Sequence, residues 1–358
     1  MKHYRYFVVL LALMLIIWLV PALVDLLVPD TRSNPFVIYS TMDASFIRFE
    51  SRDKQMHYVD FRGKEWTKQQ CDSLLPAFAF RQLLAEGRMP DSLDGQAVTP
   101  KQLQQAAFHF KTSPRQLSKH TTPLYTMLES QSGNVDLTLP PDVFRLTDEG
   151  LEFVDCTTLQ VNRAKSLSFS REMTKHGFQF PVRLIWGNAT TRKDYDNGFL
   201  MVDSRNALYQ VKMVRGMPSV RFIRFSPTEE VSPTGWKKVF TIEPKDMRLV
   251  GMAVTGNNSL YAVPATGLPI KTGIDRYDPA GMLINIVGDM QAWTVTIYTD
   301  QDSRYYALNP YTFALLDQAV VPDPEPTGWH RWRKFVLPVR LSFASWRTVD
   351  VVPVFNEY

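Results

Sequence analysis

The sequence predicts an all-β protein with a helical insertion: a β-propeller-like domain of six or seven blades behind one N-terminal transmembrane helix. Three observations predict this fold: an apolar N-terminal segment, recurring runs of alternating residues, and one region where alternation gives way to helical spacing. Aromatic residues make up 12% of the chain, with 24 prolines and 17 glycines, a composition that suits pleated strands joined by turns.

The N-terminal element is an apolar segment over residues 7–24 that contains no charged residue. At 1.5 Å per residue, a helix of this length matches the hydrocarbon core of a bilayer. Lys2 and Arg5 precede the segment, whereas Asp25 and Asp30 follow it. The positive-inside rule therefore places the N-terminus in the cytoplasm of a bacterium and the bulk of the chain in the periplasm.

A cleaved signal peptide is the alternative for this segment. Its apolar run is longer than the usual signal core, and no small-residue cleavage site follows it. An uncleaved anchor in the inner membrane is favoured. The chain then divides into a cytoplasmic stub with its anchor at 1–30 and a periplasmic domain at 31–358.

A repeated phrase follows the anchor: a short apolar run, a polar turn, and a second run that opens with an aromatic or β-branched residue. Alternation predicts strands, and Asp, Asn, Gly or Ser predicts the turn of an antiparallel hairpin. The phrase occurs at 46–61, 143–156, 199–213, 251–264, 295–308 and 339–354.

The spacing of these hairpins predicts the propeller. The second strands are marked by Tyr58, Phe153, Tyr209, Tyr261, Tyr305 and Val349, which are separated by 95, 56, 52, 44 and 44 residues. A period of this size with paired strands is typical of propeller blades. Similar patterns also occur in β-sandwiches, so another multi-sheet β architecture is the alternative.

The long first interval is explained by a helical insertion at about 64–125. One helix is expected over Glu65–Glu86, with Pro76 kinking or splitting it. A second is expected from Thr99-Pro100 to about Phe110, with Thr99 as N-cap. Packing against the rim of the β domain is favoured over a dedicated binding role. Residues 321–328 (VPDPEPTG) read as a linker.

Composition excludes several functions. The net charge of +4 is too small for a nucleic-acid partner, which requires clustered Lys and Arg. The six histidines show no zinc-binding spacing, and neither a nucleotide-binding loop nor a hydrolase nucleophile motif occurs. No cofactor is predicted, and a binding role is favoured over catalysis.

Asp194, Asp196 and Asn197 form the one candidate metal motif, since they bring three oxygen-bearing side chains together before Gly198. Calcium prefers such oxygens at a tight turn. The following residues 199–201 are apolar and no glutamate closes the loop, so an ordinary turn is favoured.

Two further groups of residues are candidates. Cys71 and Cys156 could form a disulfide in an oxidising periplasm, with two unpaired thiols as the alternative. A cationic–aromatic cluster near the C-terminus could contact sugars or anionic lipid headgroups, or else its tryptophans could be core residues. Its candidate surface residues are Trp329, Arg331, Trp332 and Arg333.

Several short motifs resemble a domain-of-unknown-function family of membrane-anchored proteins from gut-type Gram-negative bacteria. They are Arg81-Gln82-Leu83, Leu124-Tyr125 with Leu128-Glu129-Ser130, Pro141-Asp142-Val143-Phe144-Arg145, and Asp196-Asn197-Gly198 with Asp203. The resemblance covers most of the region after the anchor and implies no catalytic residues. It implies genes encoded beside those for components of ABC-type transporters.

Anchor, repeats and missing catalytic motifs together predict a membrane-tethered periplasmic binding or accessory module. The resemblance to the family implies that this module serves as an accessory subunit of an ABC-type transporter. The expected partners are the inner membrane and the transporter subunits. A periplasmic hydrolase acting on glycans or peptides is the alternative, since β domains acquire such sites through loop variation. A purely structural role in the envelope is a third hypothesis.

Overall fold

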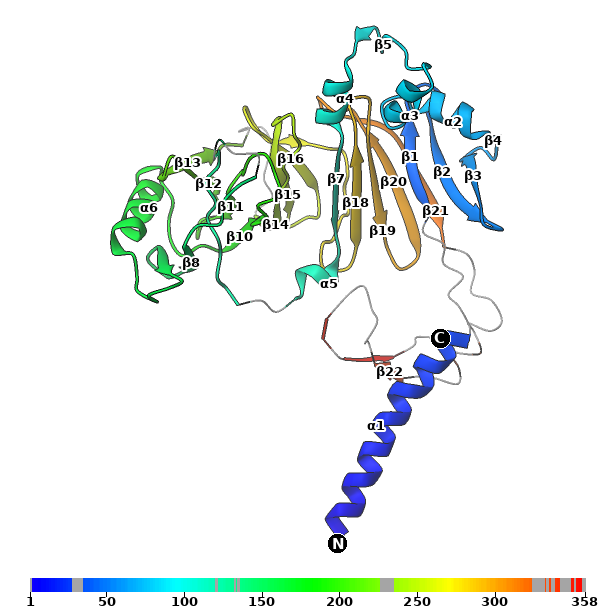
Figure 1. Cartoon of the computed structure of the whole chain (residues 1–358). Coiled ribbons are helices and arrows are strands. Elements are labelled where there is room, and N and C mark those ends of the chain that lie inside the picture. Colours follow the sequence, from blue (N-terminus) through cyan, green and yellow to red (C-terminus); the bar gives the residue numbers. More distant parts are fainter. Residues whose placement is uncertain are drawn as a thin grey trace.

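The structure is a computed structural model, and it describes residues 2–27, 35–119, 122–131, 133, 136–225 and 235–323, with a few further positions between 332 and 355. Within these ranges the chain is mostly β, with several separate antiparallel sheets and a few helices (Figure 1). The predicted all-β class with a helical insertion and an N-terminal helix is confirmed at this level.

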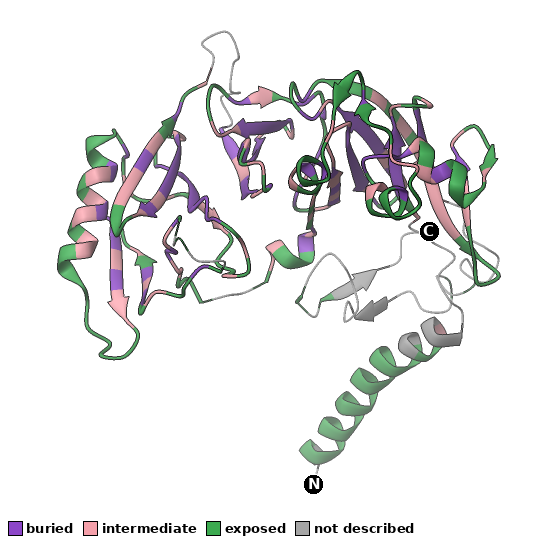
Figure 2. Ribbon diagram, turned by 45° about the horizontal axis from the view of Figure 1, so that its top comes forward, coloured by how far each residue is buried: buried purple, intermediate pink, exposed green. Residues whose placement is uncertain are grey.

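The N-terminal helix α1 (Lys2–Leu27) extends away from the β region in Figure 1. Figure 2 shows that the described residues of this helix are mostly exposed, its apolar positions included. Among the described residues it is the one helix that is long and apolar enough to cross a membrane. A membrane anchor and a signal sequence both have this character.

Four sheets are built in the same way, each as an antiparallel meander of four strands in sequence order. The first contains β1 (Phe36–Ser40), β2 (Ser45–Arg52), β3 (Gln55–Asp60) and β4 (Glu65–Trp66). The second contains β10 (Leu184–Gly187), β11 (Phe199–Val202), β12 (Leu208–Val214) and β13 (Met217–Ile223). The third contains β14 (Trp236–Thr241), β15 (Leu249–Thr255), β16 (Leu260–Pro264) and β17 (Ile270–Lys271).

The fourth sheet contains β18 (Leu283–Gly288), β19 (Trp293–Tyr298), β20 (Asp302–Leu308) and β21 (Leu315–Pro322). A fifth strand from the insertion, β7 (Phe108–Thr112), pairs with β18 at the edge of this sheet. A hairpin of β8 (Asp142–Leu146) and β9 (Leu151–Asp155) is extended by bridges at Tyr125 and Val161. Helix α6 (Arg163–Lys175), which the sequence pattern did not predict, packs on this hairpin through Phe169 and Met173.

The sheets pack face to face in a row. The β8–β9 hairpin and α6 cover the β10–β13 sheet, which packs on the β14–β17 sheet. That sheet packs on the β18–β21 sheet, which in turn packs on the β1–β4 sheet. Figure 1 places α6 and the β1–β4 sheet at opposite ends of this row.

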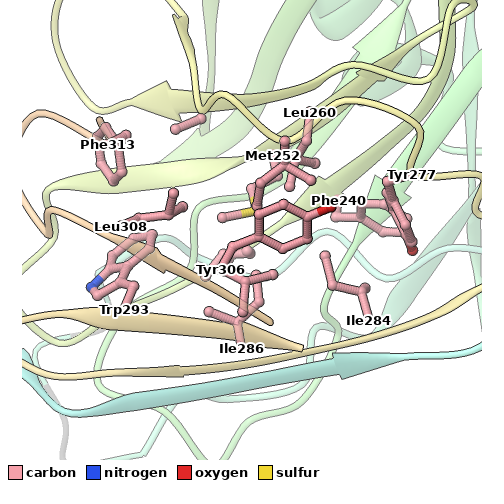
Figure 3. Close-up of a cluster of buried hydrophobic side chains, with 14 of the residues drawn as sticks. Phe240, Met252, Leu260, Tyr277, Ile284, Ile286, Trp293, Tyr306, Leu308 and Phe313 are labelled. Atoms are coloured by element: carbon pink, nitrogen blue, oxygen red, sulfur yellow. The ribbon is translucent and has the colours of Figure 1, made fainter. Parts of the chain in front are cut away.

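The largest core cluster lies between the β14–β17 and β18–β21 sheets (Figure 3). Phe240, Met252 and Leu260 meet Ile286 and Trp293 there, and all five side chains are almost fully buried. Each such burial stabilises the fold by about 1.5–3 kcal/mol relative to leaving the side chain exposed. The alternation recognised in the sequence therefore places the predicted faces in the core.

The predicted hairpins at 46–61, 143–156, 199–213, 251–264 and 295–308 are confirmed as adjacent antiparallel strands. The hairpin predicted at 339–354 corresponds to the paired β22 (Val339–Leu341) and β23 (Pro353–Phe355), while 342–348 lie outside the described residues. The first two residues of the predicted linker, 321 and 322, belong to strand β21. Residues 324–328 of the linker lie outside the described residues.

The insertion differs from its prediction in two respects. The helix expected over 65–86 is two short helices, α2 (Lys68–Leu74) and α3 (Phe80–Ala85), separated at Pro76 as its missing N–H requires. The helix expected to reach Phe110 was wrong in its second half. Helix α4 (Pro100–Ala106) has Thr99 as its N-cap, but the chain then turns into β7 because residues 108–112 pair with β18. The remaining elements are β5 (Ser92–Leu93), β6 (Gln96–Ala97) and α5 (Pro114–Leu117).

Candidate binding groove

A groove of about 650 Å³ lies between the helical insertion and the fourth sheet. One wall is formed by residues 77–82, where α2 passes into α3, together with Lys68 and Asp72 of α2. The opposite side is formed by residues 107–109 at the start of β7 and by 287–289 at the end of β18. Strand β7 thus provides both the edge of the sheet and the floor of the groove.

The floor is fixed by the pairing of β7 with β18. Residues 108 and 110 turn to the core side, where Phe108 contacts Trp293 and Phe110 contacts Phe240. Successive side chains of a strand point to opposite faces, so His109 and Lys111 share the groove side. The His109 ring Nε2 lies 2.7 Å from Asn285 Oδ1, so that nitrogen carries the proton and donates to the amide oxygen.

The wall presents aromatic and cationic side chains. Phe78 is 42% exposed, and its ring lies 5.8 Å from that of Phe36 and 6.0 Å from that of Phe49. Lys68 and Arg81 form no ion pair within the described residues. Arg81 lies over the Phe80 ring, 5.7 Å from its centroid, and Lys68 acts on the nearby Glu86, but both cations are exposed to a negatively charged ligand.

Two carboxylates also line the groove. The Oδ2 atom of Asp72 is enclosed and has no hydrogen-bond partner. Burial raises the pKa of Asp289 to about 6, while backbone N–H donors from Ala292 and Gln291 act in the opposite direction. No Ser, Thr or Cys is among the described residues that line the groove, so it offers no hydroxyl or thiol nucleophile.

One residue of the candidate metal motif, Asp196, belongs to a buried ion-pair network between two sheets. Lys193 Nζ lies 2.5 Å from Asp196 Oδ1 and 2.7 Å from both carboxylate oxygens of Glu243. The three side chains are 11%, 4% and 6% exposed, respectively. The lysine ammonium thus supplies a positive charge between the carboxylates of Asp196 and Glu243. Burial raises the pKa of Asp196, and the charge of Lys193 acts against this rise.

The other two residues of that motif have different environments. Asp194 is exposed and lies 3.4 Å from Lys245 Nζ, away from the network. Asn197 is buried, and its side-chain amide donates to the carbonyls of Ile242 and Leu249. No group of three or more His, Cys, Asp or Glu side chains suited to a metal ion occurs among the described residues.

The structure does not bring the two cysteines together. Cys71 is a free, buried thiol on α2, packed against Ile38 and Ile47, whereas Cys156 is free and exposed after β9. Burial, with a smaller contribution from Asp72, raises the pKa of Cys71 to about 12. Of the cationic–aromatic cluster, Trp332 is 48% exposed. Trp329, Arg331 and Arg333 lie outside the described residues.

The groove was missed in the sequence because its parts are far apart in the chain. His109 and Asn285, for example, are 176 residues apart. One local signal was present: Phe108-His109-Phe110-Lys111 alternates with period two, which indicates a strand rather than the end of a helix.

These features define a mostly β, multi-sheet domain with an N-terminal apolar helix and an open groove at one sheet edge. Residues 36–308 match a family described as a domain of unknown function, DUF4857. The match covers more than half of the chain, and the protein belongs to this family. The resemblance noted in the sequence is confirmed to this extent. No curated protein matches the chain.

Proposed function

We propose that this protein is a membrane-tethered periplasmic binding module that serves as an accessory subunit of an ABC-type transporter. The observation that carries the proposal is the open groove beside β7, with its exposed aromatic ring and exposed cations but no hydroxyl or thiol nucleophile among its described lining residues. Open grooves with an apolar lining and a few polar groups are typical of binding sites.

The tether and the compartment are supported by α1 and its flanking charges. The exposed apolar helix fits an anchor, and Lys2 and Arg5 at its start favour a cytoplasmic N-terminus. The resemblance to membrane-anchored proteins of gut-type Gram-negative bacteria, encoded beside ABC-type transporter components, suggests the partner. A topology reporter fused after Tyr358 should be active only in the periplasm, and activity in the cytoplasm would contradict this placement.

The architecture supports a scaffold built from blade-like units. Each of the four meander sheets packs only on its neighbours in the row, as propeller blades do. Closure into a propeller of six or seven blades is part of this proposal and has its own test. An electron-microscopy reconstruction of the intact protein should show a ring, and an open row would favour the other multi-sheet arrangement.

Site-specific photo-crosslinking in intact cells tests the binding function. A photoreactive amino acid at Phe78, on the groove wall, should crosslink to a subunit of an ABC-type transporter. The matched control is Leu167, which is 48% exposed on α6 at the far end of the row. Equal crosslinking at both positions, or none at Phe78, would contradict the proposal.

A periplasmic hydrolase is the second candidate, because His109, Asp72 and Asp289 line the same groove. Carboxylates and a histidine can act as acid and base on a glycan or peptide. Turnover of envelope glycans or peptides by the purified protein, abolished by His109→Ala, would support this candidate. Absence of turnover, combined with crosslinking at Phe78, would favour the binding module.

A further inference from the structure

We infer that the free edge of β7 binds an extended, acidic polypeptide segment, which adds to the fourth sheet as a further strand. This inference rests on the proposed binding function of the groove and names the chemical class of its ligand. It depends on three observations: the position of β7 in the sheet, the charge of the segment that contains it, and the side chains on its two faces.

Strand β7 is the terminal strand in the order β21-β20-β19-β18-β7, so only one of its edges is paired within the described residues. The unpaired edge of a strand presents backbone N–H and C=O groups that can accept another strand. Main-chain hydrogen bonds of this kind give affinity for an extended peptide, and pockets beside the edge give specificity. The groove begins at residues 107–109 and provides such a pocket.

The charge around β7 selects the kind of segment. Residues 95–128 contain Lys101, Lys111, Arg115 and Lys119 but no Asp or Glu, a local charge equal to the +4 of the whole chain. Lys101, Lys111 and Lys119 are exposed and form no ion pair within the described residues. Lys68 and Arg81 add two cations on the groove wall.

Glu86 offsets part of the charge of Lys68, but the acidic groups of the groove do not offset the charge of the segment that contains β7. Asp289 Oδ1 accepts hydrogen bonds from the backbone N–H groups of Gln291 and Ala292, so it is bound within its own turn. Asp72 is partly buried on α2, with one oxygen enclosed by protein. Neither carboxylate forms an ion pair with Lys111. The partner therefore has to supply the negative charge.

The two faces of β7 specify the pattern of the ligand. An added strand would place alternate side chains beside His109 and Lys111 and the others beside Phe108 and Phe110. The expected ligand thus alternates acidic and apolar residues over about five positions. Acidic residues directly across from Lys111 form favourable cross-strand pairs.

Peptide binding to the full-length, detergent-solubilised protein tests the inference. The probe is a fluorescent peptide that alternates Glu and Val, and the first control replaces each Glu with Lys. The second control keeps every Glu but carries N-methyl groups on alternate backbone nitrogens, which removes the pairing donors. The probe should bind, and hydrogen exchange at residues 108–112 should slow when it does. Both control peptides should bind at least about tenfold more weakly.

Protein variants provide the complementary test. The double variant Lys111→Glu/Lys119→Glu should weaken probe binding at least about tenfold, because like charges would now face each other. Arg171→Glu is the matched control, since Arg171 is exposed on α6 and without an ion pair among the described residues, and it should leave binding within about twofold. Equal binding of the N-methylated peptide, or equal losses in both variants, would overturn the inference.

A membrane surface is the other anionic partner that the test distinguishes. If vesicles containing phosphatidylglycerol displaced the probe and bound in its place, whereas phosphatidylcholine vesicles did not, lipid headgroups would be the ligand and the inference would fail. Crosslinking at Phe78 without probe binding would overturn the inference and leave the proposed function standing. If neither crosslinking at Phe78 nor probe binding occurred, both the inference and the proposed function would be overturned.

Discussion

Two charged regions of this protein differ in how their charges are satisfied. In the network between the β10–β13 and β14–β17 sheets, Lys193 is enclosed and faces the carboxylates of Asp196 and Glu243 at hydrogen-bond distance. In the groove beside β7, Lys68 and Arg81 are exposed and form no ion pair at contact distance within the described residues. The buried ion pairs link two packed sheets, whereas the exposed cations of the groove wall can meet a ligand.

The largest effect should come from removing the lysine of the network. Lys193→Met leaves two buried carboxylates without their counter-ion, and this should lower the free energy of unfolding by about 3–5 kcal/mol. Lys245→Met, which removes an exposed pair at 3.4 Å, should cost at most about 1 kcal/mol. Urea unfolding followed by tryptophan fluorescence measures both. Equal losses of unfolding free energy in the two variants would show that the buried ion pairs stabilise the protein no more than the exposed pair does.

A smaller loss is expected at the turn that positions the network. Gly198 has a φ of +67°, and a Cβ there would lie 2.3 Å from the carbonyl oxygen of Val211. Gly198→Ala should therefore cost about 2–4 kcal/mol through backbone strain and steric overlap. Gly216 has a φ of +73° but nothing within 4 Å, so Gly216→Ala should cost only about 1–2 kcal/mol. A Gly216 variant as unstable as the Gly198 variant would contradict the assigned overlap.

The groove should show its own pH dependence. Burial raises the pKa of Asp289 from 3.8 to about 6, so between these values the folded protein holds a proton that the unfolded chain has lost. The contribution of Asp289 to stability is then fully present below pH 3.8 and is lost as the pH rises to about 6. Relative to Asp289→Asn, the wild type should lose on the order of 1–3 kcal/mol across this range. Asp148→Asn, at an exposed carboxylate, should show a much smaller change in unfolding experiments at pH 4 and 7.

The smallest effect should come from calcium. Because the Lys193 ammonium lies between Asp196 and Glu243, millimolar Ca²⁺ or a chelator should shift the melting temperature by less than about 1 °C. A calcium-dependent increase of several degrees, lost in Asp196→Asn, would mean that a metal ion displaces the lysine.

The contrast between these regions also explains what the sequence could predict. Hairpins such as 199–213 were recognised because an apolar run, a polar turn and a second apolar run are local signals. The ion-pair network was not recognised, because Glu243 lies 50 residues from Lys193 in the sequence. Only the packing of two sheets brings these residues together. Asp194, Asp196 and Asn197 were candidate ion ligands with an ordinary turn favoured, and the local sequence carries no sign that Asp196 shares Lys193 with Glu243.

Strand β7 and helix α6 were missed for different reasons. Residues 108–112 follow α4 so closely that helical spacing was extended across them, although pairing with β18 decides their conformation. Helix α6 has only Phe169 and Met173 fully buried, so its apolar face is narrow and its pattern weak. The candidate groove is formed by strand β7, helices α2 and α3 of the insertion, and the end of β18. Tertiary contacts alone bring these elements together.

Hydrogen exchange of the intact protein without any ligand tests the contrast most directly. The amides of Asn197 and Gly198 donate to the carboxylates of Glu243 and Asp196, so they should exchange only at the rate of global unfolding. Alternate amides of β7, those facing away from β18, should exchange orders of magnitude faster. Uniform protection along β7 would show that its edge is already occupied and would contradict the account.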